Sequence, residues 1–280
     1  IIDCMLKIAI TGSSGFLAGH IMKQLIRSGH QVIPVTRQHL DGAVQVQDYR
    51  HTPSADLLIH LAEEPDRQKV NKIGRKYIEY SSNIAAILTE KFDGNVIYAS
   101  SGTVYGDKEE APYTINSPIY ATDIYSESKI TNERIVLESG GTVLRLSNVY
   151  GKGMSSNNVM SDIIKQLQGN NGIVVNDVSP IRDFILVTDV AKLLSIIVRT
   201  GSKGVVNVGS GASVSIYHLI KTFLKIIERK DKKIISRIKS SKASINVLDI
   251  SDTQSKFDWS PSTDLEANLQ LVLAANKGNI

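Results

Sequence analysis

The sequence predicts an α/β fold in which a doubly wound parallel sheet carries a smaller, interleaved C-terminal lobe. Short apolar runs alternate with helical patterns through the first half of the chain, which is typical of a parallel sheet covered by helices. A glycine-rich turn at 11–19 joins the first apolar run to the first helical pattern. Beyond residue 150 the alternation loosens, which indicates a lobe built from shorter elements.

Each predicted strand is a short apolar run, and each predicted helix has apolar residues three and four apart. In the first half, strands are predicted at 7–11, 31–36, 44–47, 56–62, 95–101 and 142–146, and helices up to 28, at 69–92 and at 125–139. Pro34 removes a donor from the second strand, so we expect that strand to be irregular. The connections around the third strand are too short for crossover helices, so this side of the sheet is predicted to be trimmed.

The second half is predicted to contain helices at 159–168, 188–199, 215–228 and 265–277, and strands at 173–175, 184–187, 205–208 and 245–249. Residues 5–150 form the predicted sheet domain, to which parts of 183–210 return. Residues 151–280 form most of the predicted second lobe. No internal repeat or low-complexity linker separates the two.

The composition excludes several classes of protein. The only cysteine among the 280 residues is Cys4, so no intramolecular disulfide can form, which suits the reducing cytoplasm. No apolar run reaches the roughly 18 residues of a membrane span. The net charge of +4 is modest, and much of the positive charge falls in 225–242. We interpret this run as a solvated helix face and loop, because it lacks the interleaved aromatic residues of a nucleic-acid site.

The glycine-rich turn has the spacing of a dinucleotide-binding fingerprint. Gly12 permits a tight turn after the strand, and Gly15 lets the backbone approach a pyrophosphate at the helix N-terminus. Ala18 takes the third position, where close packing of helix on sheet needs a small residue. Residues 5–150 are therefore predicted to be an NAD(P)-binding domain of the Rossmann type.

In dinucleotide-binding folds, residues at the end of the second strand contact the adenosine ribose. An acidic residue there favours NAD, whereas an arginine can pair with the 2′-phosphate of NADP. The sequence has Arg37 at this place and no acid before Asp41. It therefore leans towards NADP, with NAD as the alternative.

Tyr125 and Lys129 lie four residues apart in a predicted helix, so both side chains point the same way. An ammonium near a phenol favours the phenolate, which suits Tyr125 to proton exchange. Ser101 ends the fifth predicted strand, and a hydroxyl there can hydrogen-bond a substrate oxygen. A second pair with this spacing, Tyr217 and Lys221, lies far from these motifs, and we interpret it as incidental.

These motifs together resemble those of the extended short-chain dehydrogenases/reductases, in the nucleotide-sugar epimerase/dehydratase group. The resemblance runs nearly end to end. It rests on TGSSGFLAG at 11–19, HLA at 60–62, SSGTVYG at 100–106, YSESK at 125–129, LRLSNVYG at 144–151, RDFILVTDVA at 182–191, NVGSG at 207–211 and FDWSP at 257–261.

The resemblance implies a role for each matching position. The catalytic residues would be Ser101, Tyr125 and Lys129. The cofactor would contact Gly12, Ser14, Gly15, Phe16, Leu17, Arg37, Asp48, Leu61, Ala62, Asn83, Tyr125 and Lys129. A nucleotide-diphosphate sugar would contact Ser101, Thr103, Asn148 and Arg182. No metal site, nucleic-acid partner or membrane partner is implied, and a homodimer through the helices at 69–92 and 125–139 is expected.

The sequence departs from the family pattern at Glu63 and Glu64, which replace the small residues usual after HLA. Either a carboxylate approaches the cofactor or substrate, or each residue forms a salt bridge to a nearby cation.

Three reactions share the implied centre. The favoured one is epimerisation at the sugar C4, and a 4-keto-sugar reductase is the alternative, to which Arg37 points. A dehydratase is disfavoured, because Gly102 and Thr103 stand where family dehydratases have an Asp-Glu pair. A non-catalytic dinucleotide sensor is disfavoured too, because Ser101, Tyr125 and Lys129 are all present.

Overall fold

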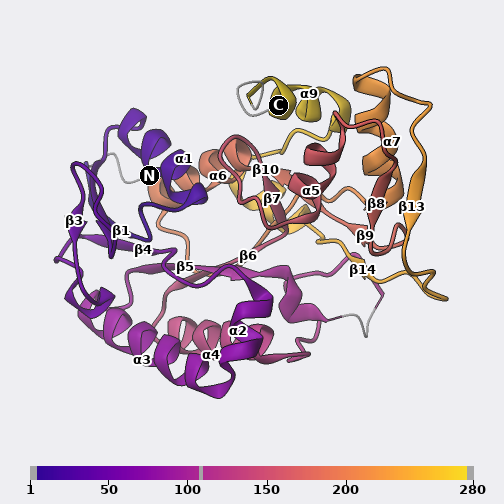
Figure 1. The fold of residues 1–280 in the computed structure, drawn as a ribbon. Helices are drawn as coiled ribbons and strands as arrows, with labels where there is room; N and C mark the ends of the chain where they lie inside the picture. The colour runs from indigo at the N-terminus through magenta and orange to yellow at the C-terminus, as the bar shows by residue number, and fades with distance from the viewer. Residues whose placement is uncertain (1–4, 107–109, 276–280) are drawn as a thin grey trace.

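A parallel seven-stranded sheet forms the centre of the part of the chain that the structure describes (Figure 1). The structure is a computed structural model, and it describes residues 5–106 and 110–275. The strand order is β11-β6-β5-β4-β1-β2-β3. These strands are β1 (Lys7–Thr11), β2 (Gln31–Thr36), β3 (Val44–Gln45), β4 (Leu57–His60), β5 (Val96–Ser101), β6 (Thr142–Leu146) and β11 (Gly204–Val208). The order reverses between β1 and β4, which confirms the predicted doubly wound sheet.

Helices cover both faces of the sheet. Figure 1 shows α3 (Arg75–Lys91) and α4 (Ile124–Glu138) side by side beneath it. The opposite face carries α1 (Phe16–Arg27) and α6 (Val187–Thr200). Because helices cover both faces, the strands are apolar on both sides, as their sequences are.

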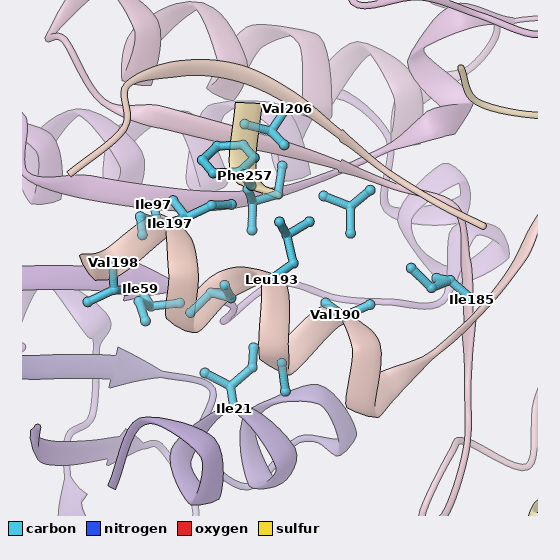
Figure 2. Packing of buried hydrophobic residues seen from close by; sticks show 14 of the residues in the cluster. Ile21, Ile59, Ile97, Ile185, Val190, Leu193, Ile197, Val198, Val206 and Phe257 are labelled. Atoms are coloured by element: carbon cyan, nitrogen blue, oxygen red, sulfur yellow. The ribbon is translucent and has the colours of Figure 1, made fainter. Parts of the chain in front are cut away.

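The main core lies between the sheet and α6. Figure 2 shows Ile59 of β4 and Ile97 of β5 facing Leu193 and Ile197 of α6, and all four are at most 3% exposed. Ile21 of α1 closes the same cluster. The branched side chains of the strands fit the pleated surface, and the helix supplies residues at three- and four-residue spacing.

The C-terminal half adds a lobe of short elements around its own core, which includes Leu219, Phe223 and Leu269. These elements are β7 (Asn148–Tyr150), α5 (Val159–Gln166), β8 (Ile173–Val175), β9 (Ile181–Arg182), β10 (Phe184–Leu186), β12 (Val214–Ser215), α7 (Ile216–Ile226), β13 (Ile234–Ser236), β14 (Ile245–Asn246), α8 (Ser251–Phe257) and α9 (Leu265–Ala275). The end of the helix predicted at 265–277 lies outside the described residues. Strands β7, β9, β12 and β13 and helix α8, of two to seven residues each, were not predicted.

Three local predictions need comment. The helix predicted at 69–92 is two helices, α2 (Arg67–Ile73) and α3, because Gly74 has φ +75° and breaks the helix. The expected irregularity at Pro34 is wrong: β2 is continuous, and β3 pairs only with its last two residues. The trimmed side is confirmed, since a loop and the 3-10 helix η1 (Tyr49–His51) replace crossover helices.

The basic run at 225–242 is more ordered than predicted. It contains β13, and Lys232 is buried, where its ammonium donates to the carbonyls of Gln166 and Leu167 at 2.6 and 2.8 Å. This lysine therefore caps the C-terminal end of α5. Among the described residues, no helix has the length and hydropathy needed to cross a membrane.

A buried carboxylate, that of Asp183, ties the lobe to the sheet. Its oxygens accept from the Ser210 amide and hydroxyl at 2.7 Å each and from the Gly211 amide at 3.1 Å. The Ser147 hydroxyl and the Leu248 amide also donate to it, at 3.2 and 3.4 Å. Segments that follow β6, β11 and β14 therefore converge on one side chain.

The space around Asp183 leaves no room for a methyl group at Gly209. A Cβ there would lie 2.3 Å from the Asp183 carboxylate, which its five donors hold in place. We expect Gly209→Ala to lower the free energy of unfolding by about 1–3 kcal/mol, measured by urea denaturation. Gly19→Ala is the matched control: a Cβ there meets nothing within 4 Å, and alanine favours α1, so stability should rise slightly. Equal stability of the two variants would contradict this account.

Candidate active site

A cavity of about 800 Å³ opens at the carboxyl ends of β1, β2 and β4, beside the reversal in strand order. Ligands of doubly wound sheets bind at this place. Its lining includes eight of the predicted cofactor contacts: Gly12, Ser14, Gly15, Phe16, Leu17, Arg37, Leu61 and Ala62. Of these, Arg37 lies at the end of β2.

The glycine-rich turn brings the N-terminal end of α1 to this cavity. Gly12 has φ +71°, and a Cβ on it would lie 3.0 Å from the Ala62 Cα, so only glycine fits. Gly15 is the N-cap of α1 and supplies no side-chain cap, and the first turn of α1 holds no acidic residue. The buried Ser13 hydroxyl has no hydrogen-bond partner among the described residues. The turn therefore suits an anionic group such as a pyrophosphate.

The β2 end of the cavity is basic and aromatic. The Arg37 guanidinium lies 5.3 Å above the Tyr49 ring centroid and donates to the Tyr80 hydroxyl at 3.2 Å. Tyr49, Tyr80 and Lys76 also line the cavity here. In the part of the lining that the structure describes, the acidic residues are Glu63 and Glu64, and they follow β4 rather than β2.

Two predicted cofactor contacts, Asp48 and Asn83, lie outside the lining that the structure describes for this cavity. The Asp48 carboxylate accepts from the Arg50 guanidinium at 2.9 and 3.1 Å and caps η1, and this residue is absent from the described lining. Asn83 is exposed on α3, since the buried face of that helix holds Ser81 and Ile84 instead. Ser81 lines the cavity, and its hydroxyl lies 2.9 Å from that of Ser128. In the sequence, Ser81 could have been found from its position four residues after Tyr77, which places both on one face of the helix.

The predicted pair Tyr125 and Lys129 comes together on α4. The Lys129 ammonium lies 5.8 Å from the Tyr125 ring centroid and donates to the Ala99 carbonyl on β5 at 2.9 Å. Ala99 lines the large cavity, whereas Tyr125, Lys129 and Ser101 are not in its described lining. The incidental pair of the sequence lies elsewhere: Tyr217 is 47% exposed on α7.

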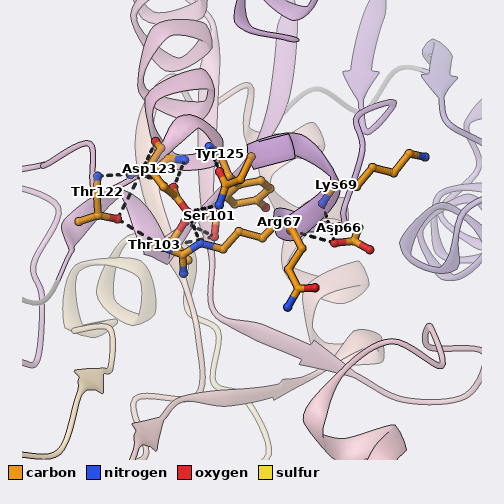
Figure 3. A network of polar contacts seen from close by, with 11 residues as sticks. Asp66, Arg67, Lys69, Ser101, Thr103, Thr122, Asp123 and Tyr125 are labelled. Carbon is orange, nitrogen blue, oxygen red and sulfur yellow. Dashed lines mark hydrogen bonds and ion pairs between the residues drawn. The ribbon is translucent and has the colours of Figure 1, made fainter. Parts of the chain in front are cut away.

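Ser101 ends β5 and begins the 3-10 helix η2 (Gly102–Tyr105). Its hydroxyl oxygen accepts from the Thr103 amide at 3.2 Å and from the Thr103 hydroxyl at 3.0 Å. Figure 3 shows Ser101 and Thr103 together with the polar network at the start of α4. The end of β5 and the start of η2 therefore carry two hydroxyls in contact with each other.

Polar contacts fix the start of α4, and with it Tyr125. Asp123 is the N-cap of α4 and forms a capping box with Ser126. Its carboxylate also accepts from Arg67 at 2.5 Å and from Asn71 at 2.8 Å, both on α2 (Figure 3). Burial alone would raise the pKa of Asp123, but the hydrogen bonds from Ser126, Asn71 and Arg67 lower it to about 2. The Tyr125 amide donates to the Asn71 side chain at 3.0 Å, so α2 and α4 share one network.

Glu63 and Glu64 both form ion pairs with nearby lysines. Salt bridges to nearby cations were one of the two alternatives that the sequence left open for these residues. Glu64 pairs with Lys69 at the surface, and Glu63 pairs with Lys129 in the interior, where both side chains are 8% exposed. Nearby, His60 is buried with its Nδ1 atom 2.7 Å from the Thr11 hydroxyl. Burial lowers the pKa of His60 to about 4, so its ring is neutral at neutral pH.

A loop from the C-terminal half lies along one edge of the large cavity. Gly153 and Ser155 line it. The His20 ring nitrogen Nε2 donates to the Lys152 carbonyl at 2.9 Å, and the Asn157 amide donates to Asp66, the N-cap of α2, at 2.8 Å. These contacts join the loop to the sheet domain.

The predicted substrate contacts Asn148 and Arg182 line a second cavity of about 690 Å³ in the C-terminal half. The Arg182 guanidinium donates to the Ile181 and Ser244 carbonyls at 2.8 Å each. Lys165 and Arg237 add positive charge to the same lining, and Arg237 was not singled out from the sequence, where it is one of many cations at 225–242.

The Asp123 network yields a test of how Tyr125 is held. We expect Asp123→Ala to lower the free energy of unfolding by about 1–2 kcal/mol, because α4 loses its N-cap. Asp123→Asn keeps the cap and loses the charge, so its loss should be smaller. The pKa of Asp123 is below its ordinary value, so the stabilisation is full above pH 4 and is lost as the pH falls towards 2. Urea denaturation between pH 7 and 2 checks both points, and equal losses in the two variants would contradict the capping role.

Comparison with known proteins agrees with this geometry. A sequence model of the NAD dependent epimerase/dehydratase family matches residues 8–209. The chain is 26% identical to a putative UDP-glucose 4-epimerase of Methanocaldococcus jannaschii, over 97% of this chain and 99% of that protein. It is 25% identical to a GDP-6-deoxy-D-mannose reductase of Pseudomonas aeruginosa, over 96% of both.

A solved structure shares the fold. The UDP-glucose 4-epimerase of Bifidobacterium longum, in complex with NAD+ and UDP, has a TM-score of 0.82 at 20% identity, with 98% of each chain covered. The family match spans most of the sheet domain and the two sequence relatives span the chain nearly end to end. The chain therefore belongs to the NAD dependent epimerase/dehydratase family.

Proposed function

We propose that this chain is a nucleotide-sugar 4-epimerase in which Tyr125 exchanges the proton of the sugar hydroxyl. The observation that carries the proposal is the position of the Lys129 ammonium. It lies 5.8 Å from the Tyr125 ring centroid and hydrogen-bonds Ala99, which lines the cavity with the glycine-rich turn. A tyrosine held beside such a cavity can exchange a proton with a ligand hydroxyl.

The glycine-rich turn, Leu61 and Ala62 would hold the dinucleotide, whose nicotinamide supplies the redox chemistry when it is bound. The donors of the turn fit a pyrophosphate, and the cavity of about 800 Å³ is in the range of ligand sites. Ser101 and Thr103 would orient the sugar hydroxyl towards Tyr125. Lys129 would hold the nicotinamide ribose.

Asn148 and Arg182 would bind the nucleotide-diphosphate sugar in the second cavity, with Lys165 and Arg237 adding positive charge. A guanidinium suits the oxygens of a diphosphate. The same proposal includes a homodimer through α3 and α4, which pack side by side on one face of the sheet (Figure 1).

A 4-keto-sugar reductase that uses NADPH is the second candidate, favoured by Arg37. Arg37 lies at the end of β2. The acidic residues in the part of the lining that the structure describes, Glu63 and Glu64, follow β4, so neither replaces the acid that NAD-binding proteins have at the end of β2. A dehydratase is not favoured, because Gly102 is buried and a Cβ on it would lie 3.1 Å from the Asn246 side chain. An acidic residue there would have to displace the Asn246 side chain.

The role of Tyr125 is tested by Tyr125→Phe. We expect kcat with UDP-glucose, or with the best substrate of a nucleotide-sugar panel, to fall by at least ~100-fold, because the proton acceptor is lost. Cofactor affinity, measured by fluorescence titration with NADH and NADPH, should change little. Tyr217→Phe is the matched control: the same atom is removed from the exposed Tyr–Lys pair on α7, and activity should remain. Full activity of Tyr125→Phe would overturn the proposal.

The choice of cofactor is tested by Arg37→Ala. If Arg37 contacts a 2′-phosphate, the variant should bind NADPH about tenfold more weakly or worse, with little change for NADH. Arg50→Ala, which removes a guanidinium from the same side of the sheet outside the described lining, is the control. An equal effect on both cofactors would exclude selection of NADP by Arg37. Tightly bound NAD in the purified protein would then favour the epimerase, and an empty site that binds NADPH the reductase.

A further inference from the structure

The interior ion pair of Glu63 and Lys129 stands where the cavity meets the proposed proton-transfer residues. Glu63 follows the carboxyl end of β4 and lines the cavity, while Lys129 lies behind it on α4. Both side chains are 8% exposed. A carboxylate is seldom buried to this extent unless it is paired and hydrogen-bonded, because removing a charge from water is costly.

The Glu63 carboxylate is held by three neighbours. The Tyr98 hydroxyl donates to its two oxygens at 2.8 and 2.9 Å, and the Asn132 amide donates to Oε1 at 2.6 Å. Tyr98 and Asn132 are fully buried. The Lys129 ammonium donates to Oε2. These donors leave Glu63 no freedom to swing into the cavity.

The Lys129 ammonium is fixed by the same arrangement. It donates to Glu63 and to the Ala99 carbonyl, and it lies 5.0 Å from the Tyr98 ring centroid and 5.8 Å from that of Tyr125. An ammonium has three donors, and Glu63 and Ala99 accept two of them. Glu63 thus determines where Lys129 points and how much of its charge Tyr125 experiences.

We propose that Glu63 is a positioning residue of this active centre, which completes a Tyr125–Lys129–Glu63 triad by holding the ammonium in place and offsetting its charge. This inference rests on the proposed roles of Tyr125 and Lys129. It assigns a task to a residue that departs from the small residues of the family pattern at this position.

The ionisation of both partners agrees with the triad. Burial alone would lower the pKa of Lys129, but the Glu63 carboxylate and other neighbouring groups together more than offset burial and raise this pKa. Burial alone would raise the pKa of Glu63, but Lys129, His60 and the hydrogen bond from Tyr98 together more than offset burial, so this pKa is lowered. Both groups are therefore charged at neutral pH.

Other titratable groups face the pair from every packed element. They are His60 on β4, Tyr77 on α3, Tyr98 on β5, and Tyr125 and Glu133 on α4. His60 is neutral at neutral pH. The carboxylate of Glu133 is paired with Arg145 at 2.8 Å. Glu63 is thus the negative charge that compensates Lys129.

The test is Glu63→Gln, an isosteric change that removes the charge. Without it the pKa of Lys129 should fall. The alkaline limb of the pH profile of kcat, where Lys129 loses its proton, should therefore move to lower pH by about one unit. The pH at which NADH or NADPH binding weakens in alkali, followed by fluorescence without any substrate, should move in the same direction.

Glu266→Gln is the matched control, since Glu266 pairs with Lys225 at 2.5 Å on the surface and should leave both profiles in place. Suppose that Glu63→Gln is less active but that neither its kcat profile nor its cofactor-binding profile shifts along the pH axis. This result would overturn the triad, because a purely structural role predicts it.

If Glu63→Gln does not fold, Glu63→Asp is measured in its place, since it withdraws the charge by one methylene. A folded Glu63→Asp variant whose two pH profiles do not shift would overturn the inference. If no nucleotide-sugar is turned over by the unaltered protein, the proposed function fails while the binding measurement still decides the role of Glu63.

Discussion

The buried carboxylate of Asp183 is the contact on which the joint between the two halves depends. The carboxylate accepts hydrogen bonds from segments that follow β6, β11 and β14. The backbone carbonyl of Asp183 also accepts one from the Asn148 amide at 3.0 Å. Its neighbour Arg182 lines the second cavity. Because Asp183 is joined to the sheet and to the lobe, it fixes the position of the proposed substrate contacts relative to the strand ends that carry the cofactor turn. A buried carboxylate without hydrogen-bond donors would cost free energy of folding, so the five donors around Asp183 are required for this joint.

Helix α4 is docked on the sheet by charges as well as by apolar packing. Lys129, Asn132 and Glu133 are all buried on the face that the helix turns towards the sheet. Glu133 binds Arg145 of β6, and Lys129 binds Glu63 after β4. These pairs restrict the helix to one register, since a slip along its axis would leave charges buried without partners. Tyr125, one turn before Lys129, takes its position from the same restraints.

Much of the fold and part of the site were predictable from the sequence. The β1–turn–α1 unit was correct because Gly12, at φ +71°, has a backbone geometry that other residues rarely adopt. Long-range partners were not predictable: nothing near Glu63 in the chain identifies Lys129, which lies 66 residues away. The exposure of Asn83 was not predictable either, because a shift of two positions on a helix turns a side chain from the buried face to solvent.

The loop with Gly153 and Ser155 is joined to the sheet domain by two exposed hydrogen bonds, one from His20 and one from Asn157. In water each such bond contributes about 0.5–1.5 kcal/mol, since solvent offers an equivalent partner. Thermal motion can therefore separate this loop from α1 and α2 without disturbing the core of either half. The residence time of a bound dinucleotide would then be governed by its contacts with the glycine-rich turn rather than by the loop that borders its entrance.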